Sequence, residues 1–337
     1  MKLITSPRKV AITAFLVIVH QTKQTFAIDQ GSTIIKEEDN NKDGKHKMNQ
    51  HSRRVQTTAC KPGTLYSLDQ RSPFDNYEFV SIDINTFASG QDAVLIGNTG
   101  IGLSDIGIAD AGAAGLPNDD FIYLLNSNNS FYKVNKATGI TTTLGFDVVP
   151  LFGQWTGLAF DLNTEILYGL SSQNGATYIG IIDPVTGSVT DTSIFVNVFC
   201  GLSLAINGQS VAYIHDCDDN NIYSIDLNTL SAGSNVAATL VGPTGFQTGD
   251  TSGMSWDPSS DVIYMTSFIC EAELRSVNID TGEATLIGII NSSIGEEALF
   301  GFAAFDTCGY SGGGSKSSKG SKTSKSNKAS KSKAGRR

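Results

Sequence analysis

A short block of sequence recurs five times in this chain at a nearly constant spacing. In its clearest copy, the apolar runs 157–161 and 166–170 flank Asp-Leu-Asn-Thr-Glu, a sequence that turns readily, so they predict an antiparallel hairpin. The first run of each copy ends at Asp110, Asp161, Asn207, Asp257 and Asp306, at separations of 51, 46, 50 and 49 residues. The second run of each copy carries a tyrosine, namely Tyr66, Tyr123, Tyr168, Tyr213 and Tyr264.

Two further elements follow each hairpin. A four-residue pattern with Asp or Asn first and Thr last occurs at 83–86, 135–138, 183–186, 226–229 and 278–281, without a spacing error. Its acceptor and hydroxyl side chains are typical of turns, so we interpret it as the connection between a third and a fourth strand. The fourth run closes on glycine in four copies, at Gly97, Gly145, Gly242 and Gly288. Four short strands at a period near 45–50 residues indicate the blades of a β-propeller.

The sequence therefore predicts an all-β, five-bladed propeller of four-stranded blades. From the innermost strand outward, we assign blade one to 105–110, 121–125, 131–135 and 140–145, blade two to 157–161, 166–170, 178–183 and 189–193, blade three to 202–207, 211–216, 222–226 and 237–242, and blade four to 253–257, 262–268, 274–278 and 284–288. Blade five combines 301–306 with 64–69, 78–83 and 93–97. Pairing of the N-terminal and C-terminal strands within blade five is then expected to close the ring.

The cysteines test this arrangement. Cys60 precedes the opening strand and Cys308 follows the closing one, so a bridge between them would stand where other blades have a hairpin turn. Cys200 and Cys217 flank an expected hairpin, whose ends an antiparallel pair brings together. Cys217–Cys270 stays open as an alternative, because Cys270 occupies the loop equivalent to that of Cys217 one blade later.

The two ends of the chain differ in composition from the expected propeller at 60–310. Residues 1–27 have a basic start, an apolar run from 10 to 19 and small residues near 27, which predicts a secretory signal peptide. Residues 28–59 are polar and are expected to be disordered, as is the basic Ser/Lys-rich tail at 311–337. No later apolar run approaches the length of a membrane span. We expect an exported protein, either extracellular or associated with a cell wall.

Charge is divided sharply between body and tail. Residues 60–310 carry 28 Asp and Glu against 5 Lys and Arg, a formal charge of −23, whereas the tail carries +9. Such a body repels nucleic acid and anionic membranes, while the tail attracts polyanions and silicic or phosphate surfaces. An extracellular polysaccharide, a protein or a mineral surface is the expected partner, with the chain as a monomer.

Repeated side chains are expected to be structural. The five tyrosines, together with Phe160, Trp256 and Phe305, suit the gaps between blades. Candidate ligand-binding residues lie in the loops before the innermost strands and after the second strands, which open on the same face of a propeller. The predicted binding face comprises Asp105, Gln154, Trp155, His215, Asp216, Asp250, Glu296 and Glu297, and the predicted metal ligands are Asp218, Asp219, Glu271 and Glu273.

The chemistry of these residues limits what the face can do. Carboxylates and amides suit Ca²⁺ rather than zinc. His215 is the only histidine in 60–310, which excludes chemistry that needs two, while a catalytic triad with a single histidine stays open. We expect His215 at the rim rather than as a base. No catalytic constellation stands out, and Walker, Rossmann and zinc-finger spacings are absent from the sequence.

Two resemblances extend this interpretation. The blocks at 64–66, 157–161 and 181–187 resemble the secreted YVTN/PQQ-like propeller-repeat proteins, a class that includes binding scaffolds and lactonase-like enzymes. In the tail, lysines recur at every third position from Lys316 to Lys331 with serines between them, which resembles the Ser/Lys-rich segments of silaffins and related diatom wall proteins. That second resemblance implies modified lysines, phosphorylated serines and association with silica.

Two functions follow from these observations. The first is a secreted, non-catalytic scaffold that binds a ligand on its acidic face and a wall or mineral through its tail. The alternative is a lactonase- or hydrolase-like enzyme with a Ca²⁺ ion in the central channel as Lewis acid. The candidate loops differ from blade to blade without a dense set of ligands, which favours the scaffold.

Overall fold

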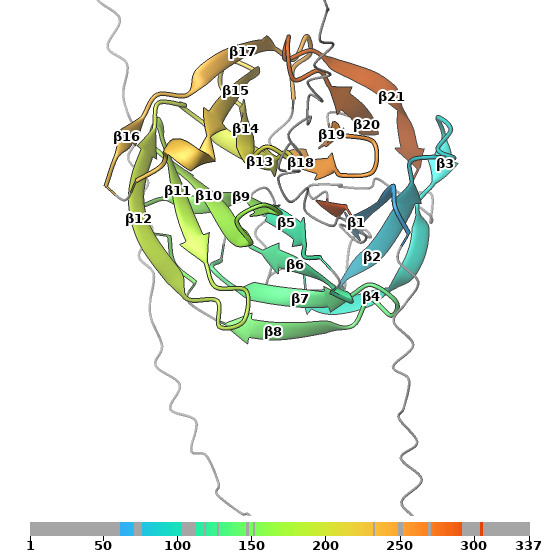
Figure 1. Cartoon of the computed structure of the whole chain (residues 1–337). Helices are drawn as coiled ribbons and strands as arrows, with labels where there is room; N and C mark the ends of the chain where they lie inside the picture. Colours follow the sequence, from blue (N-terminus) through green and yellow to red (C-terminus); the bar gives the residue numbers. More distant parts are fainter. Residues whose placement is uncertain are drawn as a thin grey trace, which may run out of the picture. The chain divides into compact units, whose positions relative to one another are not determined.

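The described residues form a β-propeller. The computed structural model describes residues 61–70, 76–102, 112–117, 119–126, 128–145, 148–150, 152–231, 233–248, 252–268, 271–291 and 304–305, all within the compact unit 55–337. Five mainly antiparallel sheets of four or five strands are arranged around a ring (Figure 1). The predicted all-β fold with five blades is confirmed.

Each blade runs outward from an innermost strand. Blade one is β5 (Gly112–Gly115), β6 (Phe121–Leu125), β7 (Phe131–Asn135) and β8 (Thr141–Gly145). Blade two is β9 (Gln154–Asp161), β10 (Ile166–Gln173), β11 (Ala176–Ile182) and β12 (Val189–Val196), with β16 (Asn235–Val236) on its outer edge. Blade three is β13 (Gly201–Ile206), β14 (Val211–Asp216), β15 (Asn221–Asp226) and β17 (Thr239–Pro243), and includes the 3₁₀ turn η1 (Leu227–Thr229). Blade four is β18 (Ser252–Asp257), β19 (Val262–Phe268), β20 (Ala272–Val277) and β21 (Ala284–Asn291), with β3 (Gln91–Asp92) outside. Blade five is β22 (Ala304–Phe305), β1 (Thr64–Gln70), β2 (Asn76–Asp83) and β4 (Val94–Gly102).

One predicted strand requires correction. The innermost strand of blade one is β5 at Gly112–Gly115, and not residues 105–110, which lie outside the described residues. Ala114 faces Tyr123 across the hairpin, just as Ala159 faces Tyr168 in blade two. The prediction was wrong because it aligned an aspartate, whereas this blade has no aspartate at the equivalent position. Small residues occupy β5 because the neighbouring strand β9 lies against it, and a Cβ atom at Gly112 would overlap the backbone of Leu158.

The ring closes through the two ends of the propeller. β22 pairs antiparallel with β1, with Phe305 opposite Leu65 and Ala304 opposite Tyr66. The innermost strands then contact one another in the order β5, β9, β13, β18, β22 and back to β5. The predicted closure is therefore confirmed. The expected Cys60–Cys308 bridge lies outside the described residues.

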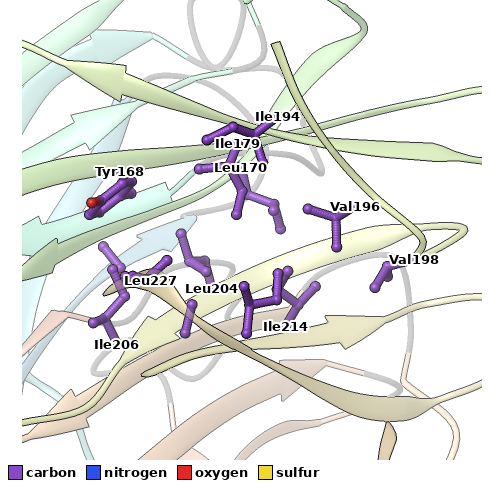
Figure 2. Close-up of a cluster of buried hydrophobic side chains, with 13 residues drawn as sticks. Tyr168, Leu170, Ile179, Ile194, Val196, Val198, Leu204, Ile206, Ile214 and Leu227 are labelled. Carbon is purple, nitrogen blue, oxygen red and sulfur yellow. The ribbon is translucent and has the colours of Figure 1, made fainter. Parts of the chain in front are cut away.

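Apolar side chains fill the interfaces between neighbouring blades. The described residues contain five buried clusters, each drawn mainly from two adjacent blades. Figure 2 shows the cluster between blades two and three, where Leu170 and Ile179 meet Leu204 and Ile214. Each repeated tyrosine lies in a different one of these clusters, as predicted: Tyr66, Tyr123, Tyr168, Tyr213 and Tyr264.

The four-residue patterns form the predicted turns between third and fourth strands. In the copy at 183–186, the carboxylate of Asp183 accepts hydrogen bonds from the backbone N–H of Val185 at 2.8 Å and from the hydroxyl of Thr186 at 2.9 Å. These bonds hold the pKa of Asp183 below its usual value. In the copy at 135–138, the side chain of Asn135 accepts from the backbone N–H groups of Ala137 and Thr138.

In three blades, the recurrent glycine of the fourth strand lies against the turn of the next blade. A Cβ atom at Gly97 would overlap the carbonyl oxygen of Thr138, and one at Gly242 would overlap that of Thr281. Gly145 approaches Thr186 in the same way, but at 3.4 Å. The recurrent glycine and the recurrent turn are thus two halves of one contact between blades.

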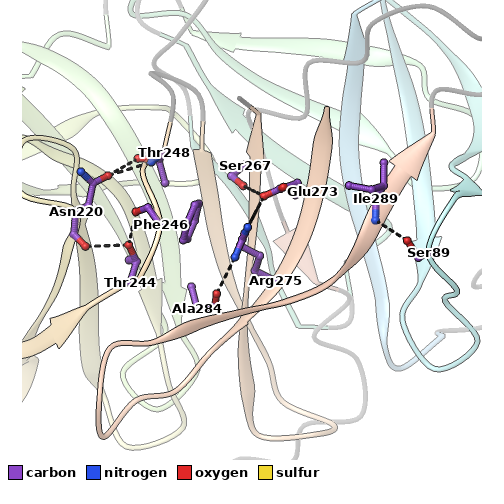
Figure 3. Close-up of polar contacts among 10 residues, drawn as sticks. All are labelled: Ser89, Asn220, Thr244, Phe246, Thr248, Ser267, Glu273, Arg275, Ala284 and Ile289. Atoms are coloured by element: carbon purple, nitrogen blue, oxygen red, sulfur yellow. Dashed lines mark hydrogen bonds and ion pairs between the residues drawn. The ribbon is translucent and has the colours of Figure 1, made fainter. Parts of the chain in front are cut away.

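Two short fifth strands link blades at the periphery. β16 leaves blade three to pair in parallel with β12 of blade two, and β3 leaves blade five to pair in parallel with β21 of blade four. The backbone N–H of Ile289 donates to the hydroxyl of Ser89 at 3.2 Å beside the second of these strands (Figure 3). Each fifth strand covers an edge that would otherwise present unpaired backbone groups.

The contact between glycine and turn can be tested by adding a methyl group. Gly97→Ala should lower the free energy of unfolding by about 1–3 kcal/mol, because the backbone at Thr138 must move to admit the Cβ atom. Gly145→Ala is the matched control in the next blade and should change it by less than about 0.5 kcal/mol. Chemical denaturation of both variants measures this difference. Equal effects at the two positions would contradict the assignment.

Candidate functional site

A cleft opens on the predicted face between blades two and three. Its volume is about 380 Å³. The loop before β13, the hairpin turn after β10 and the start of β9 supply its walls. Its lining residues are Gln154, Thr156, Ser172, Gln173, Asn174, Gly175, Phe199, Cys200, Gly201, Leu202 and Cys217.

A disulfide holds one wall of the cleft. Cys200 and Cys217 are bonded, with their Cα atoms 5.3 Å apart, and the backbone N–H of Cys217 donates to the carbonyl oxygen of Cys200 at 2.9 Å. This confirms the cross-strand pair predicted from the hairpin. The alternative pairing of Cys217 with Cys270 is wrong for this structure, because Cys217 is already bonded.

Asp216 orders the same wall from beneath. Its carboxylate accepts hydrogen bonds from the backbone N–H groups of Phe199 at 2.9 Å, Cys200 at 3.3 Å and Asp218 at 2.8 Å. Asp216 is only 1% exposed. Its negative charge is therefore used to fix two loops and is not presented to a ligand.

The floor of the cleft joins the two blades. The hydroxyl of Thr156 in β9 donates to the carbonyl oxygen of Gly201 at 2.6 Å, and the backbone N–H of Gly201 donates to Thr177 Oγ1 at 3.0 Å. All three residues are buried. These bonds tie the start of β13 to blade two, so the floor is rigidly placed.

Phe199 forms an exposed aromatic wall. Its side chain is 58% exposed, and its ring lies against Gly175, where a Cβ atom would overlap it. Gly175 also has a φ of +83°, which the tight turn after β10 requires. Beside this turn, Gln173 Oε1 accepts from the backbone N–H of Gly153 at 3.1 Å, which places the Gln173 amide.

Of the residues predicted for the binding face, Gln154 lines the cleft and Trp155 is buried in the core. Gln154 is exposed and lines the cleft. Trp155 is 1% exposed, its indole N–H donates to the carbonyl oxygen of Val148, and its ring fills the space beside Gly169 and Gly180. Trp155 therefore belongs to the core between blades one and two. Four of the predicted residues lie outside the described residues, namely Asp105, Asp250, Glu296 and Glu297.

His215 is in the core and not at the rim, so the expected rim position is corrected. Its side chain is 0% exposed, and Nδ1 lies 3.3 Å from the hydroxyl of Ser252 in blade four. Burial lowers the pKa of His215 to about 4, although the charge of Asp219 acts in the opposite direction. His215 lies on the side of β14 that faces blade four, and its position in the sequence did not reveal this orientation.

The predicted metal ligands are dispersed or already paired. Within the described ranges, no three His, Cys, Asp or Glu side chains form a group that could hold a metal ion. Asp219 accepts from the hydroxyl of Tyr223 at 2.6 Å, and Asp218 and Glu271 are exposed. Glu273 pairs with Arg275 at 2.8 Å, while the guanidinium of Arg275 lies 3.8 Å from the ring centroid of Phe246 (Figure 3).

Among the described residues, the innermost strands line a small cavity inside the ring. The cavity there has a volume of about 20 Å³, enough for about one water molecule. Its lining comes from all five blades and is mainly apolar, including Ala113, Leu158, Ala205, Met254 and Phe305. Ca²⁺ takes six to eight oxygen ligands, which this lining does not supply. Ca²⁺ binding elsewhere on the predicted face stays a prediction.

Several cleft residues were missed in the sequence. Phe199, Gln173 and Asn174 are uncharged, whereas most of the predicted site residues are carboxylates. The turn formed by Asn174 and Gly175 gave the one usable signal, since this pair favours a tight hairpin next to the face.

The fold and the site define this protein as a five-bladed β-propeller with a neutral cleft on one face. No protein-family model matches the chain, and no curated protein matches it either. The solved structures that are similar to it include the nidogen/laminin complex, with a TM-score of 0.45 and 9% identity over 72% of this chain and 97% of that chain. TolB from Acinetobacter baumannii gives a TM-score of 0.42 and 13% identity over 70% of this chain and 54% of that chain. A protein of unknown function from Bacteroides thetaiotaomicron gives a TM-score of 0.45 and 18% identity over 73% of this chain and 62% of that chain. At these values the similarity supports no functional argument.

No helix among the described residues is long and apolar enough to cross a lipid bilayer.

Removal of the disulfide should destabilise the propeller. Replacing Cys200 and Cys217 with serine opens a loop of 17 residues, so the free energy of unfolding should fall by about 3 kcal/mol. Denaturant titration under non-reducing conditions measures this loss. Peptide mapping of the unaltered chain should recover Cys200 linked to Cys217, and recovery of Cys217 linked to Cys270 would contradict the assignment.

The buried histidine predicts a loss of stability in acid. The native state holds His215 neutral down to about pH 4, whereas the unfolded chain protonates it near pH 6.5, so the unfolded state binds more protons between these values. Stability due to this group is complete above about pH 6.5 and falls by up to about 3 kcal/mol as the pH approaches 4.

His215→Asn removes the titrating group and should flatten this part of the profile. Denaturation of both proteins from pH 7.5 to pH 4 measures the difference, and the carboxylates, which are common to the two proteins, cancel. Parallel profiles for the two proteins would show that the imidazole is not responsible.

Proposed function

We propose that this chain is a secreted, non-catalytic binding propeller. It attaches to a wall or mineral surface through its basic tail and presents the cleft of blades two and three to a ligand. The composition of the cleft lining carries this proposal. Among its described residues, hydrogen-bonding groups come from amides, hydroxyls and backbone, and no lining side chain titrates, since both cysteines are in the disulfide. Such a lining suits recognition rather than proton transfer.

The position of His215 supports the same conclusion. A general base must reach the proton that it removes from a substrate. His215 is fully buried between blades three and four and does not line the cleft. The narrow, mainly apolar interior of the ring also gives no support to the alternative hydrolase with a Ca²⁺ ion at that level.

The charge distribution supports attachment through the tail. The tail carries +9 and the propeller region −23, so an anionic surface attracts the tail and repels the body. The body would then stand away from the surface with its cleft accessible. A wall polysaccharide or a silica surface fits this arrangement.

Attachment can be tested with silica particles and the full chain. Binding is expected at 0.05 M NaCl and should be lost at 0.5 M, because salt screens exposed charges. A variant with serine at the six positions Lys316, Lys319, Lys322, Lys325, Lys328 and Lys331 should bind weakly at both concentrations. Binding that is indifferent to this change would refute the role of the tail.

Absence of catalysis can be tested with the same protein. Assays on ester and lactone substrates with and without added Ca²⁺ should give no turnover above buffer. Turnover that requires Ca²⁺ and is lost when Asp250, Glu296 and Glu297 become amides would replace the proposed function with the hydrolase.

A further inference from the structure

We infer that the cleft between blades two and three binds a neutral carbohydrate, with a sugar ring on the face of Phe199. This inference rests on the proposed binding function and names the ligand class of the same cleft. The cleft volume of about 380 Å³ falls within the range of ligand pockets, about 300–1,000 Å³.

The lining excludes three other classes of ligand. A phosphate or sulfate group would need a cation, and none of the lining residues is Lys, Arg or His. A divalent metal ion favours carboxylates, but none of the lining residues is Asp or Glu, and the nearby carboxylate of Asp216 already accepts hydrogen bonds from three backbone N–H groups. A purely apolar ligand would cover the exposed amides of Gln154 and Asn174 without offering them hydrogen-bond partners. A ligand with both hydroxyl groups and apolar C–H faces satisfies the whole lining.

Phe199 provides the apolar surface for such a ligand. The ring lies against Gly175, which fixes its position, and more than half of the side chain remains exposed. The backbone of Phe199 is held by Asp216, and the next residue is held by the disulfide. An exposed phenylalanine fixed in this way is preorganised, so little conformational entropy is lost when a ligand stacks on it.

The amides around this ring match sugar hydroxyls. Gln154 and Asn174 are exposed in the cleft and offer both donors and acceptors, which is what a hydroxyl group requires. A neutral peptide is the nearest competing ligand. Peptides commonly pair with an open sheet edge, whereas this cleft lies at the ends of strands near the ring interior. The charge of the body also favours neutral chains over acidic polysaccharides.

The test uses the full chain at 0.5 M NaCl, which suppresses binding through the tail. Calorimetric titration with soluble neutral oligosaccharides of glucose, xylose and mannose should reveal binding by at least one of them. Phe199→Ala should weaken that binding on the order of tenfold, and Gln154→Ala should weaken it independently. Phe199→Tyr should retain it, because the stacking face is preserved.

Phe152→Ala is the matched control. Phe152 is 40% exposed and stacks on Tyr178 in the same blade, with ring centroids 4.4 Å apart, but it does not line the cleft. Its loss should leave the affinity unchanged.

Three results would overturn the inference. These are no binding by any of the sugars, binding that Phe199→Ala and Gln154→Ala do not alter, or preferential binding of an uncharged peptide at this cleft. Retained silica binding with no sugar binding would overturn the carbohydrate assignment and leave the proposed attachment function standing. Hydrolysis of a bound sugar would overturn the non-catalytic function instead.

Discussion

Two residue pairs between the ends of the propeller make the ring possible. Phe305 and Ala304 complete the sheet that begins at Leu65 and Tyr66, so β1 has an inner neighbour and blade five is whole. Without this pairing, blade five would lack its innermost strand, and the contacts of β22 with β5 and with β18 would be lost. Both the interface with blade one and the interface with blade four depend on closure, because the buried clusters there include Ala304 and Phe305.

In the closed ring, the recurrent residues make contacts between neighbouring blades. A tyrosine enters each apolar interface, and a glycine on the outer strand admits the turn of the next blade. The Gly97 contact with Thr138 is made by backbone atoms, which explains why no larger side chain fits there. The recurrent tyrosines and glycines are therefore explained by the packing of blades in the ring and do not indicate a ligand.

Function must then reside where the blades differ. Between blades two and three, a disulfide, a buried aspartate and a tight turn combine to hold an aromatic ring in the open. The carboxylate of Asp216 accepts hydrogen bonds from backbone N–H groups and does not face the cleft. The cleft lining is therefore neutral, although the body is strongly acidic. In the proposed function, ligand binding in the cleft and attachment by the tail should therefore respond differently to salt, since only attachment would depend on exposed charge.

The sequence by itself determined the architecture of this protein. Blade number, blade order and closure of the ring follow from local patterns, because turn-forming residues act over a few positions. The fifth strands β3 and β16 were not predicted, and the sequence left Cys217–Cys270 open beside the Cys200–Cys217 bridge. The inner strand of blade one was misplaced, since Gly112–Gly115 lacks the aspartate that marks most other copies.

Only the tertiary structure decided the site. Whether a residue on β14 or β9 faces solvent or the next blade depends on a neighbour distant in sequence, so Trp155 and His215 proved to be buried. Phe199 became a candidate only when Gly175 and Asp216 were seen to hold it in place, a three-dimensional coincidence that no linear spacing encodes.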